Sequence, residues 1–341
     1  MTKTLHGKGV GEYFVNILNG MAKGLFASLI IGLIIKQIGT YSHIALLARF
    51  GQAAQYLMGP AIGVGVAVAV NASPLGIFCS AVTGAIGAGT FVWDGTVAAK
   101  IVIGEPVGAL LAAWAGAEIS KLIAGKTKVD IILVPLTTII AGGLVGVFLA
   151  PVVSAMMGAI GAFVNKLTTL YPFPMGVLVS VVVGIILTLP ISSAAICISL
   201  GISGLAAGAA TVGCCAQMVG FAVASYRENR IGGLISQGLG TSMLQMPNIV
   251  RNWKIWIPAT LSAAILGPLS TMVFKMENNA SGAGMGTSGL VGQFNTINVM
   301  GFEAWWKILL LHFILPAILA LVFSEAMRYK GWIKPGDMKL S

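Results

Sequence analysis

Long apolar runs with very few charges constrain the fold of this 341-residue chain more than any other feature. Only 9% of the residues are Asp, Glu, Lys or Arg, whereas 57% are hydrophobic. Such a chain cannot cover a globule with polar surface, which excludes a soluble enzyme and also a disordered protein. The runs suit α-helical crossings of ~20 residues and lack the alternation of a membrane β-barrel. The sequence therefore predicts an all-α integral membrane protein with about ten transmembrane helices.

The basic residues lie in short segments between the apolar runs, as in the cytoplasmic loops of membrane proteins. Twenty Lys and Arg stand against ten Asp and Glu, and we take this excess as a sign of orientation, not of nucleic-acid binding. The basic clusters at 121–128, 227–230, 251–254 and 328–339 all reach one side if ten segments cross. We therefore expect both termini in the cytoplasm.

The expected crossings end at Pro, Gly or charged residues. They cover approximately 17–38, 53–72, 74–92, 101–122, 130–149, 175–200, 203–224, 255–274 and 305–327. The fifth is expected to stop at Pro151. Segment 152–170 has two interpretations, a tenth crossing or an amphipathic helix in the membrane interface.

Two Gly-rich segments, 232–248 and 280–298, are apolar but too short and too broken to cross a membrane. Gly238–Leu244 aligns with Gly284–Leu290, and both begin Gly-x-Gly-Thr-Ser. We interpret them as paired re-entrant segments around a binding site in the membrane, where irregular backbone is tolerated if it is buried or lines a cavity. The alternative is two Gly-rich surface loops with a chance match.

Amide and carboxylate groups in and beside these segments offer donors and acceptors that suit a neutral, hydroxyl-rich solute. The candidate substrate-binding residues are Gln237, Gln245, Asn248, Glu277, Asn278, Asn279, Gln293 and Asn295, with Ser192 and Ser193 as a third wall. Each group has an alternative interpretation. The 277–279 run also suits an exterior turn, and the serines also suit hydrogen bonds to carbonyls freed by Pro190.

No motif for catalysis, a cofactor or a metal stands out in the sequence. The cysteines at 79, 197, 214 and 215 lie in apolar runs without metal-ligand spacing, and we interpret them as packing residues. His312 is the only histidine within an apolar crossing, where a hydrogen-bonded histidine is favoured over a proton relay. We therefore expect no catalytic residue, no cofactor and no metal.

Three longer runs resemble the membrane EIIC-like proteins of the phosphotransferase system. They are PFPMGVLVSVVVGIILTLPISSAA, LISQGLGTSMLQMPNIVRN and ILGPLSTMVFKMENNASGAGMGTSGLVGQ. The resemblance covers residues 15 to 330 approximately, and it is strongest to the branch of toxin regulators named after the perfringolysin O regulator.

The resemblance implies a homodimer in the bacterial inner membrane with the fold of the glucose superfamily of EIIC proteins. Residues 1–170 would form the scaffold and dimerisation half, and residues 171–341 the transport half with two re-entrant hairpins. The small-residue pair Gly142-x-x-x-Gly146 allows the close helix contacts that a dimer needs. The Gly-Ile-Thr-Glu signature of sugar-binding relatives is replaced here by Gly284–Gly289, which contains no Glu.

The leading hypothesis is a permease that binds and translocates a small polar solute, a carbohydrate or related metabolite. One alternative is a membrane sensor or regulator without transport. Another is a phosphotransferase EIIC subunit coupled to separate EIIA and EIIB chains, because no EIIB phosphocysteine or EIIA histidine domain is recognisable. On its own, the chain is not expected to be an enzyme.

Overall fold

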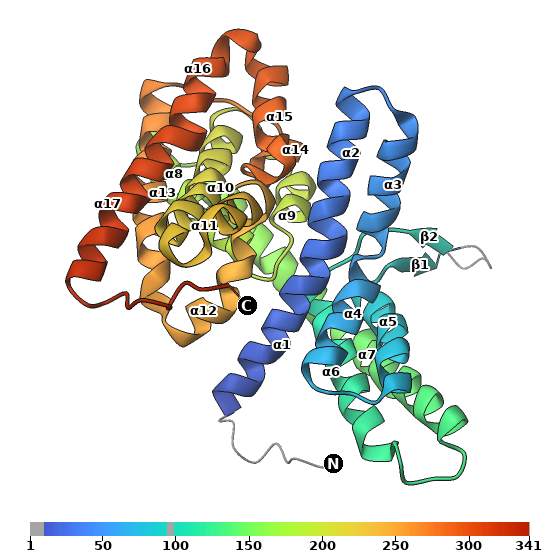
Figure 1. Cartoon of the computed structure of the whole chain (residues 1–341). Helices are drawn as coiled ribbons and strands as arrows, with labels where there is room; N and C mark the ends of the chain where they lie inside the picture. Colours follow the sequence, from blue (N-terminus) through green and yellow to red (C-terminus); the bar gives the residue numbers. More distant parts are fainter. Residues whose placement is uncertain (1–9, 94–98, 341) are drawn as a thin grey trace. The chain divides into compact units, whose positions relative to one another are not determined.

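The computed structural model describes residues 10–93 and 99–340, and 81% of these described residues are helical (Figure 1). Within these described ranges, the only sheet is an antiparallel pair, β1 (Phe91–Trp93) and β2 (Ala99–Ile101). The predicted all-α class is therefore confirmed. The chain divides into two compact units, unit 1 (Met1–Ser154) and unit 2 (Ala155–Ser341).

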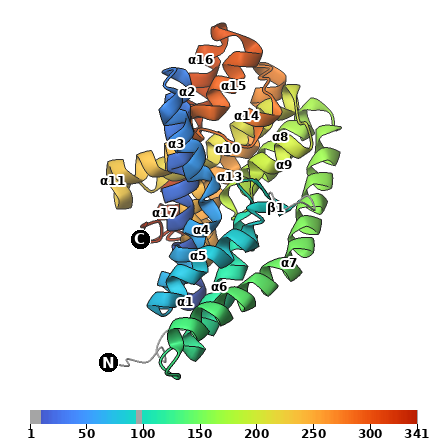
Figure 2. The same ribbon diagram turned by 90° about the vertical axis from the view of Figure 1, so that its right-hand side faces the viewer.

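Unit 1 is built from helices that follow one another with short connections. In order they are α1 (Val10–Leu25), η1 (Phe26–Ile30), α2 (Ile31–Tyr41), α3 (Ala45–Tyr56), α4 (Met58–Ala69), α5 (Pro74–Ala88) and α6 (Pro106–Ile123). Helix α4 packs against α1 and α5, and α5 packs against α6, as Figure 2 shows.

Local signals fix several of these helix ends. The side chain of Ser73 caps α5 by accepting a hydrogen bond from the Gly76 N–H at 3.1 Å, and Pro74 takes the first helical position. The same helix ends at Gly89, whose φ of 68° lies in the left-handed region that favours glycine. Pro106 begins α6 in the same way, so the predicted crossing at 101–122 starts later than expected.

The small residues of unit 1 bring helix backbones into contact with one another. A Cβ added at Gly63 would lie 1.9 Å from the carbonyl oxygen of Ser80. Gly142 and Gly146 pack in the same way inside unit 1, the first against Thr83 and the second against Gly87. The small-residue pair that favoured a dimer is therefore used within the chain.

Helix α7 (Asp130–Thr168) runs without interruption through 39 residues, and Figure 2 shows it along its length. The crossing predicted at 130–149 agrees with the membrane-length apolar stretch Asp130–Leu149, but the helix itself does not end at Pro151, and segment 152–170 is mostly the second part of this helix. A proline removes one backbone hydrogen bond and can bend a helix, but apolar sequence on both sides lets the helix continue.

Unit 2 is organised around α10 (Gly204–Ala224), which is almost completely buried. It packs against α8 (Pro172–Thr188), α13 (Ile257–Pro268) and α17 (Leu315–Tyr329). Shorter elements complete the unit: α9 (Ser193–Ser199), α11 (Tyr226–Ile235), η2 (Ser236–Gly240), η3 (Ser242–Gln245), α12 (Met246–Arg251), η4 (Trp253–Trp256), η5 (Leu269–Val273), α14 (Ala280–Ala283), η6 (Ser288–Leu290), α15 (Val291–Met300), η7 (Phe302–Ala304), α16 (Trp305–Ile308) and η8 (Leu309–Ile314).

Six helices in the described part of the chain are long and apolar enough to cross a membrane. They are Gly11–Tyr41, Pro106–Ile123, Asp130–Leu149, Gly204–Ala224, Trp253–Val273 and Phe302–Tyr329. Three shorter apolar helices accompany them, Met58–Ala69, Pro74–Ala88 and Pro172–Thr188. A multi-pass membrane protein is thus supported, whereas the predicted total of ten crossings is not confirmed.

Candidate functional site

The first Gly-rich segment is broken into short pieces, as predicted, and its amide side chains are buried. It passes from α11 through the π-helical turn η2 and the 3-10 turn η3 into α12. Gln237 and Gln245 are fully buried, and Asn248 is 4% exposed. The structure therefore brings the three predicted residues of this segment together inside unit 2.

These three amides form one hydrogen-bonded chain. The Asn248 Nδ2 donates to Gln245 Oε1 at 2.8 Å, and the Gln245 Nε2 donates to Gln237 Oε1 at 2.9 Å. The second N–H of each of the Gln245 and Asn248 amides reaches the C-terminal segment, residues 330–340. Gln245 Nε2 donates to the carbonyl oxygen of Met338, and Asn248 Nδ2 to that of Lys339, both at 2.9 Å. The amides predicted to bind solute thus hold another part of the same chain.

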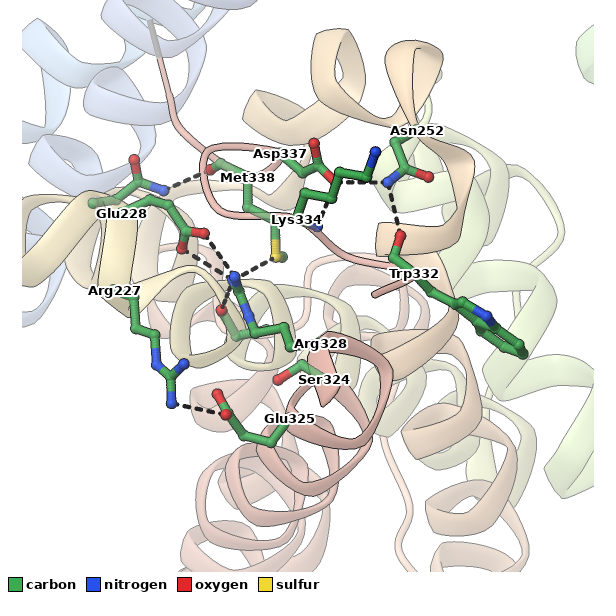
Figure 3. A network of polar contacts seen from close by, with 12 residues as sticks. Arg227, Glu228, Asn252, Ser324, Glu325, Arg328, Trp332, Lys334, Asp337 and Met338 are labelled. Atoms are coloured by element: carbon green, nitrogen blue, oxygen red, sulfur yellow. Dashed lines mark hydrogen bonds and ion pairs between the residues drawn. The ribbon is translucent and has the colours of Figure 1, made fainter. Parts of the chain in front are cut away.

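The C-terminal segment is fastened by further side chains, shown in Figure 3. Asn252 Nδ2 donates to Asp337 Oδ2 at 2.8 Å and to the Trp332 carbonyl oxygen at 3.1 Å. Asn229 Nδ2 donates to the Met338 carbonyl oxygen at 2.8 Å, and the Met338 side chain is fully buried. Sequence reasoning treated this segment only as a basic tail. Its buried apolar residues, Met338 and Ile333, were the available signal of a packed segment.

The second Gly-rich segment consists of α14, η6 and α15, and asparagines fasten its start. Asn278 is 1% exposed, and its Nδ2 donates to Thr211 Oγ1 of α10 at 2.8 Å and to Thr296 Oγ1 at 3.0 Å. Asn279 caps α14 by accepting from the Gly282 N–H at 3.0 Å, and its Nδ2 donates to Asn295 Oδ1 at 3.0 Å. These asparagines therefore organise the segment against α10.

Glu277 does not join this group, because its side chain is exposed. Its backbone N–H lies 3.2 Å from the sulfur of Met300. The interpretation of 277–279 as an exterior turn fits Glu277, which is exposed, but not Asn278 beside it, which is buried. The 277–279 run thus divides between the surface and the interior of unit 2.

The two Gly-x-Gly-Thr-Ser motifs contact each other and the same helix, α10. The hydroxyl of Thr287 in the second motif donates to the carbonyl oxygen of Gly238 in the first. Gly286, with φ of 53°, lies against Cys214 of α10, where an added Cβ would come within 2.8 Å of that residue. Gly238 faces Ala222 on the same helix. The two motifs that match in sequence are thus also in contact in the structure.

Buried polar side chains surround this contact on one side. Thr188 Oγ1 lies 2.8 Å from the hydroxyl of Ser242, which ends the first motif. It also lies 3.4 Å from Gln217 Oε1 of α10, which accepts from Trp256 Nε1 at 2.9 Å. Sequence reasoning missed Gln217, although a lone amide within the apolar run 203–224 is the signal that identifies it.

A second polar group lies on the elements that come after the second motif. Gln293 is 5% exposed, and its Nε2 lies 3.1 Å from Nδ1 of the fully buried His312 in η8. It also lies 3.4 Å from the sulfur of Cys215. His312 thus has the hydrogen-bonded neighbour that its sequence context favoured. Gln293 Oε1 and His312 Nε2 have no hydrogen-bond partner within the described ranges.

The two serines near Pro190 separate in the structure. Ser193 is 5% exposed, and its hydroxyl donates to the carbonyl oxygen of Gly284 at 2.7 Å. A Cβ at Gly284 would lie 2.5 Å from the Ser193 carbonyl oxygen, so the two backbones touch. Ser192 is half-buried and lies just before α9. Ser193 therefore fastens the second motif to α9.

No group of three or more His, Cys, Asp or Glu side chains in the described part could hold a metal ion. The four cysteines are free and buried.

A family model described as "Phosphotransferase system, EIIC" matches residues 15–340, which include both Gly-rich segments. No curated protein and no solved structure matches the chain.

Proposed function

Because this chain belongs to the EIIC family of the phosphotransferase system, we propose that it binds a neutral sugar where its two Gly-rich motifs meet and carries it across the bacterial inner membrane. Membership of the family makes it a sugar-transporting, multi-pass membrane component. The observation that carries the finer proposal is the contact between Thr287 and Gly238 beside α10.

Broken helices in the interior leave backbone groups that need polar partners, and a solute with many hydroxyls supplies them. The side chains nearby are amides, hydroxyls and an imidazole, which bind neutral groups without burying a charge. Thr188, Gln217 and Ser242 supply such groups on one side, and Gln293 and His312 supply them on another. A neutral sugar suits this set better than an ion does.

Among the candidate residues, Gln293 is the one that we assign to direct contact with the sugar. When its amide N–H donates to His312 Nδ1, the histidine carries its proton on Nε2. Gln293 Oε1 then offers an acceptor and His312 Nε2 a donor, neither of them engaged within the described residues. Sugar hydroxyls both donate and accept, so they match this combination. We assign Gln245, Asn248 and Asn278 to holding the segments in place.

Replacing Gln293 with leucine is expected to weaken sugar binding about 5- to 150-fold, since one buried hydrogen-bond partner contributes ~1–3 kcal/mol. Calorimetry or ligand-induced thermal shift of the purified protein with a panel of sugars measures this change. Asn165→Leu, which removes an exposed amide from α7, is the matched control and is expected to bind normally. A folded Gln293→Leu protein with unchanged affinity would place the site elsewhere.

We propose that separate EIIA and EIIB chains supply the phosphoryl group, as is usual for this family. Proteoliposomes that contain the chain should then accumulate phosphorylated sugar only when both soluble partners and a phosphoryl donor are present. Equal uptake of unmodified sugar without them would indicate an uncoupled permease. The match extends to the family and not to the toxin-regulator branch, so the sensor alternative receives no separate support.

We also propose a homodimer, on the basis of the family resemblance alone. Gly142 and Gly146 pack within unit 1, so they do not support an interface between chains. Mass measurement in lipid nanodiscs should give twice the mass of one chain. A monomeric mass at every lipid composition tested would contradict the proposal.

Our proposed orientation places both termini in the cytoplasm. Lys126→Cys should then react with a membrane-impermeant thiol reagent only from the inside, and Glu277→Cys only from the outside. Both positions are exposed, and the native cysteines are buried, so background labelling should be low. Labelling of residue 126 in intact cells would overturn the orientation.

A further inference from the structure

An apolar cavity of about 390 Å³ lies in unit 2 beside the first Gly-rich segment. Its walls come from α10, from the segment between Leu234 and Leu239, and from the last long helix around Ala317. Every side chain that lines it is apolar. A sugar would find no side-chain hydrogen-bond partner there, so the cavity is distinct from the proposed sugar site.

The cavity is not sealed inside the protein. Three of its lining residues, Leu234, Ile235 and Ile314, are 37%, 55% and 40% exposed. Ile231 on α11 and Ile318 on α17 extend this apolar surface and are 62% and 51% exposed. In a chain that crosses a membrane, an exposed apolar surface of this kind contacts lipid acyl chains. The cavity therefore opens onto a surface suited to lipid.

The segment that forms one wall begins with basic residues. Arg227 and Arg230 lie in α11, which leads directly into Leu234 and Ile235. Both arginines are exposed; Arg227 pairs with Glu325 at 2.8 Å, whereas no ion pair of Arg230 is found within the described ranges. Basic residues next to an apolar membrane surface attract the phosphates of anionic lipids. The charge therefore favours an anionic headgroup above an apolar cavity.

We propose that one acyl chain of an anionic phospholipid occupies this cavity, with its headgroup near Arg230. Two of the walls are π-helical turns, η2 and η8, and such turns are frequent at functional sites. Gly238 in η2 borders the cavity, and its carbonyl oxygen accepts the hydrogen bond from Thr287. An acyl chain in the cavity would therefore contact Gly238, the residue through which the two motifs meet. The lipid site does not depend on which solute the protein carries.

The first test compares three additives on the unaltered, delipidated protein in mild detergent. Dioleoyl phosphatidylglycerol should give retained adducts in native mass spectrometry and raise the melting temperature by roughly 2 °C or more. Dioleoyl phosphatidylcholine, with the same chains, should bind more weakly, and glycerol 3-phosphate alone should have no effect. An effect of glycerol 3-phosphate equal to that of the lipid, or no adduct with either lipid, would overturn the proposal.

The second test fills the cavity. Ala317→Phe should reduce retention of phosphatidylglycerol about tenfold, because its ring displaces roughly two methylene groups of the acyl chain. Val322→Phe, at an exposed position of α17 that does not line the cavity, is the matched control and should retain lipid normally. Arg230→Gln should remove the preference for phosphatidylglycerol over phosphatidylcholine. Equal retention by a folded Ala317→Phe protein would contradict the proposal; if this variant does not fold, the additive comparison decides alone.

Discussion

Replacing Arg328 with methionine is expected to destabilise unit 2 by about 3–5 kcal/mol, because the carboxylate of Glu228 would stay buried without its cation. The two side chains are only 9% and 8% exposed. Two parallel contacts join them, Nη1 to Oε1 at 2.9 Å and Nη2 to Oε2 at 3.0 Å. Arg328 Nη2 also donates to the carbonyl oxygen of Ala224 at 2.9 Å, which ties α17 to the end of α10.

The measurement is a double-mutant cycle on denaturation of the purified protein. Arg328→Met combined with Glu228→Gln should recover a large part of the lost stability, because neither charge is then left buried alone. Arg227→Met is the matched control, since its pair with Glu325 is 68% and 39% exposed and contributes at most about 1 kcal/mol. Equal losses in the Arg328 and Arg227 variants would show that the buried pair has no special role.

The C-terminal segment shows why the sequence could identify polar residues without identifying their partners. Gln245 and Asn248 are predicted from the sequence as amides that suit the hydroxyls of a neutral solute, and both are buried in the structure. Their partners are the backbone carbonyls of Met338 and Lys339, about 90 residues further along the chain. A backbone carbonyl has no sequence signature, so only the tertiary fold reveals this use.

The motif repeat was more informative, because it is a local pattern with a structural meaning. The matching motifs predicted two paired segments, and the hydrogen bond from Thr287 to Gly238 joins them. The repeat carries no information on the contacts made by residues beyond each motif. Gln293 contacts His312, which comes from a separate helix, so no local sequence pattern connects the two.

Helix type was predictable, and helix limits were less so. The crossing predicted at 203–224 corresponds to α10 at Gly204–Ala224, because the apolar run in the sequence has nearly the same limits as the helix. The predicted crossing at 53–72 is instead divided between α3 and α4 near Leu57. Hydrophobicity decides whether a segment is buried in the membrane. It does not fix where a helix ends, as the continuation of α7 past Pro151 also shows.

Gly213→Ala is expected to have the second large effect, a loss of about 3 kcal/mol in the stability of unit 2. A Cβ at this position would lie 1.9 Å from the carbonyl oxygen of Ser180 and 2.6 Å from its Cα. Gly184, which lies on α8 like Ser180, faces the Gly213 carbonyl in turn, so α8 and α10 touch backbone to backbone. No flexible side chain can move aside, and the two helices must separate.

Gly158→Ala in α7 is the matched control, because an added Cβ there meets no atom within 4 Å. Alanine is favoured over glycine inside a helix by roughly 0.5–1 kcal/mol, so this variant should be slightly more stable than the unaltered protein. The two substitutions add the same methyl group and are expected to act in opposite directions. Because Thr188 and Gln217 lie on α8 and α10, separation of these helices should also weaken sugar binding. A Gly213→Ala protein as stable as the Gly158→Ala protein would contradict the close approach of the two backbones.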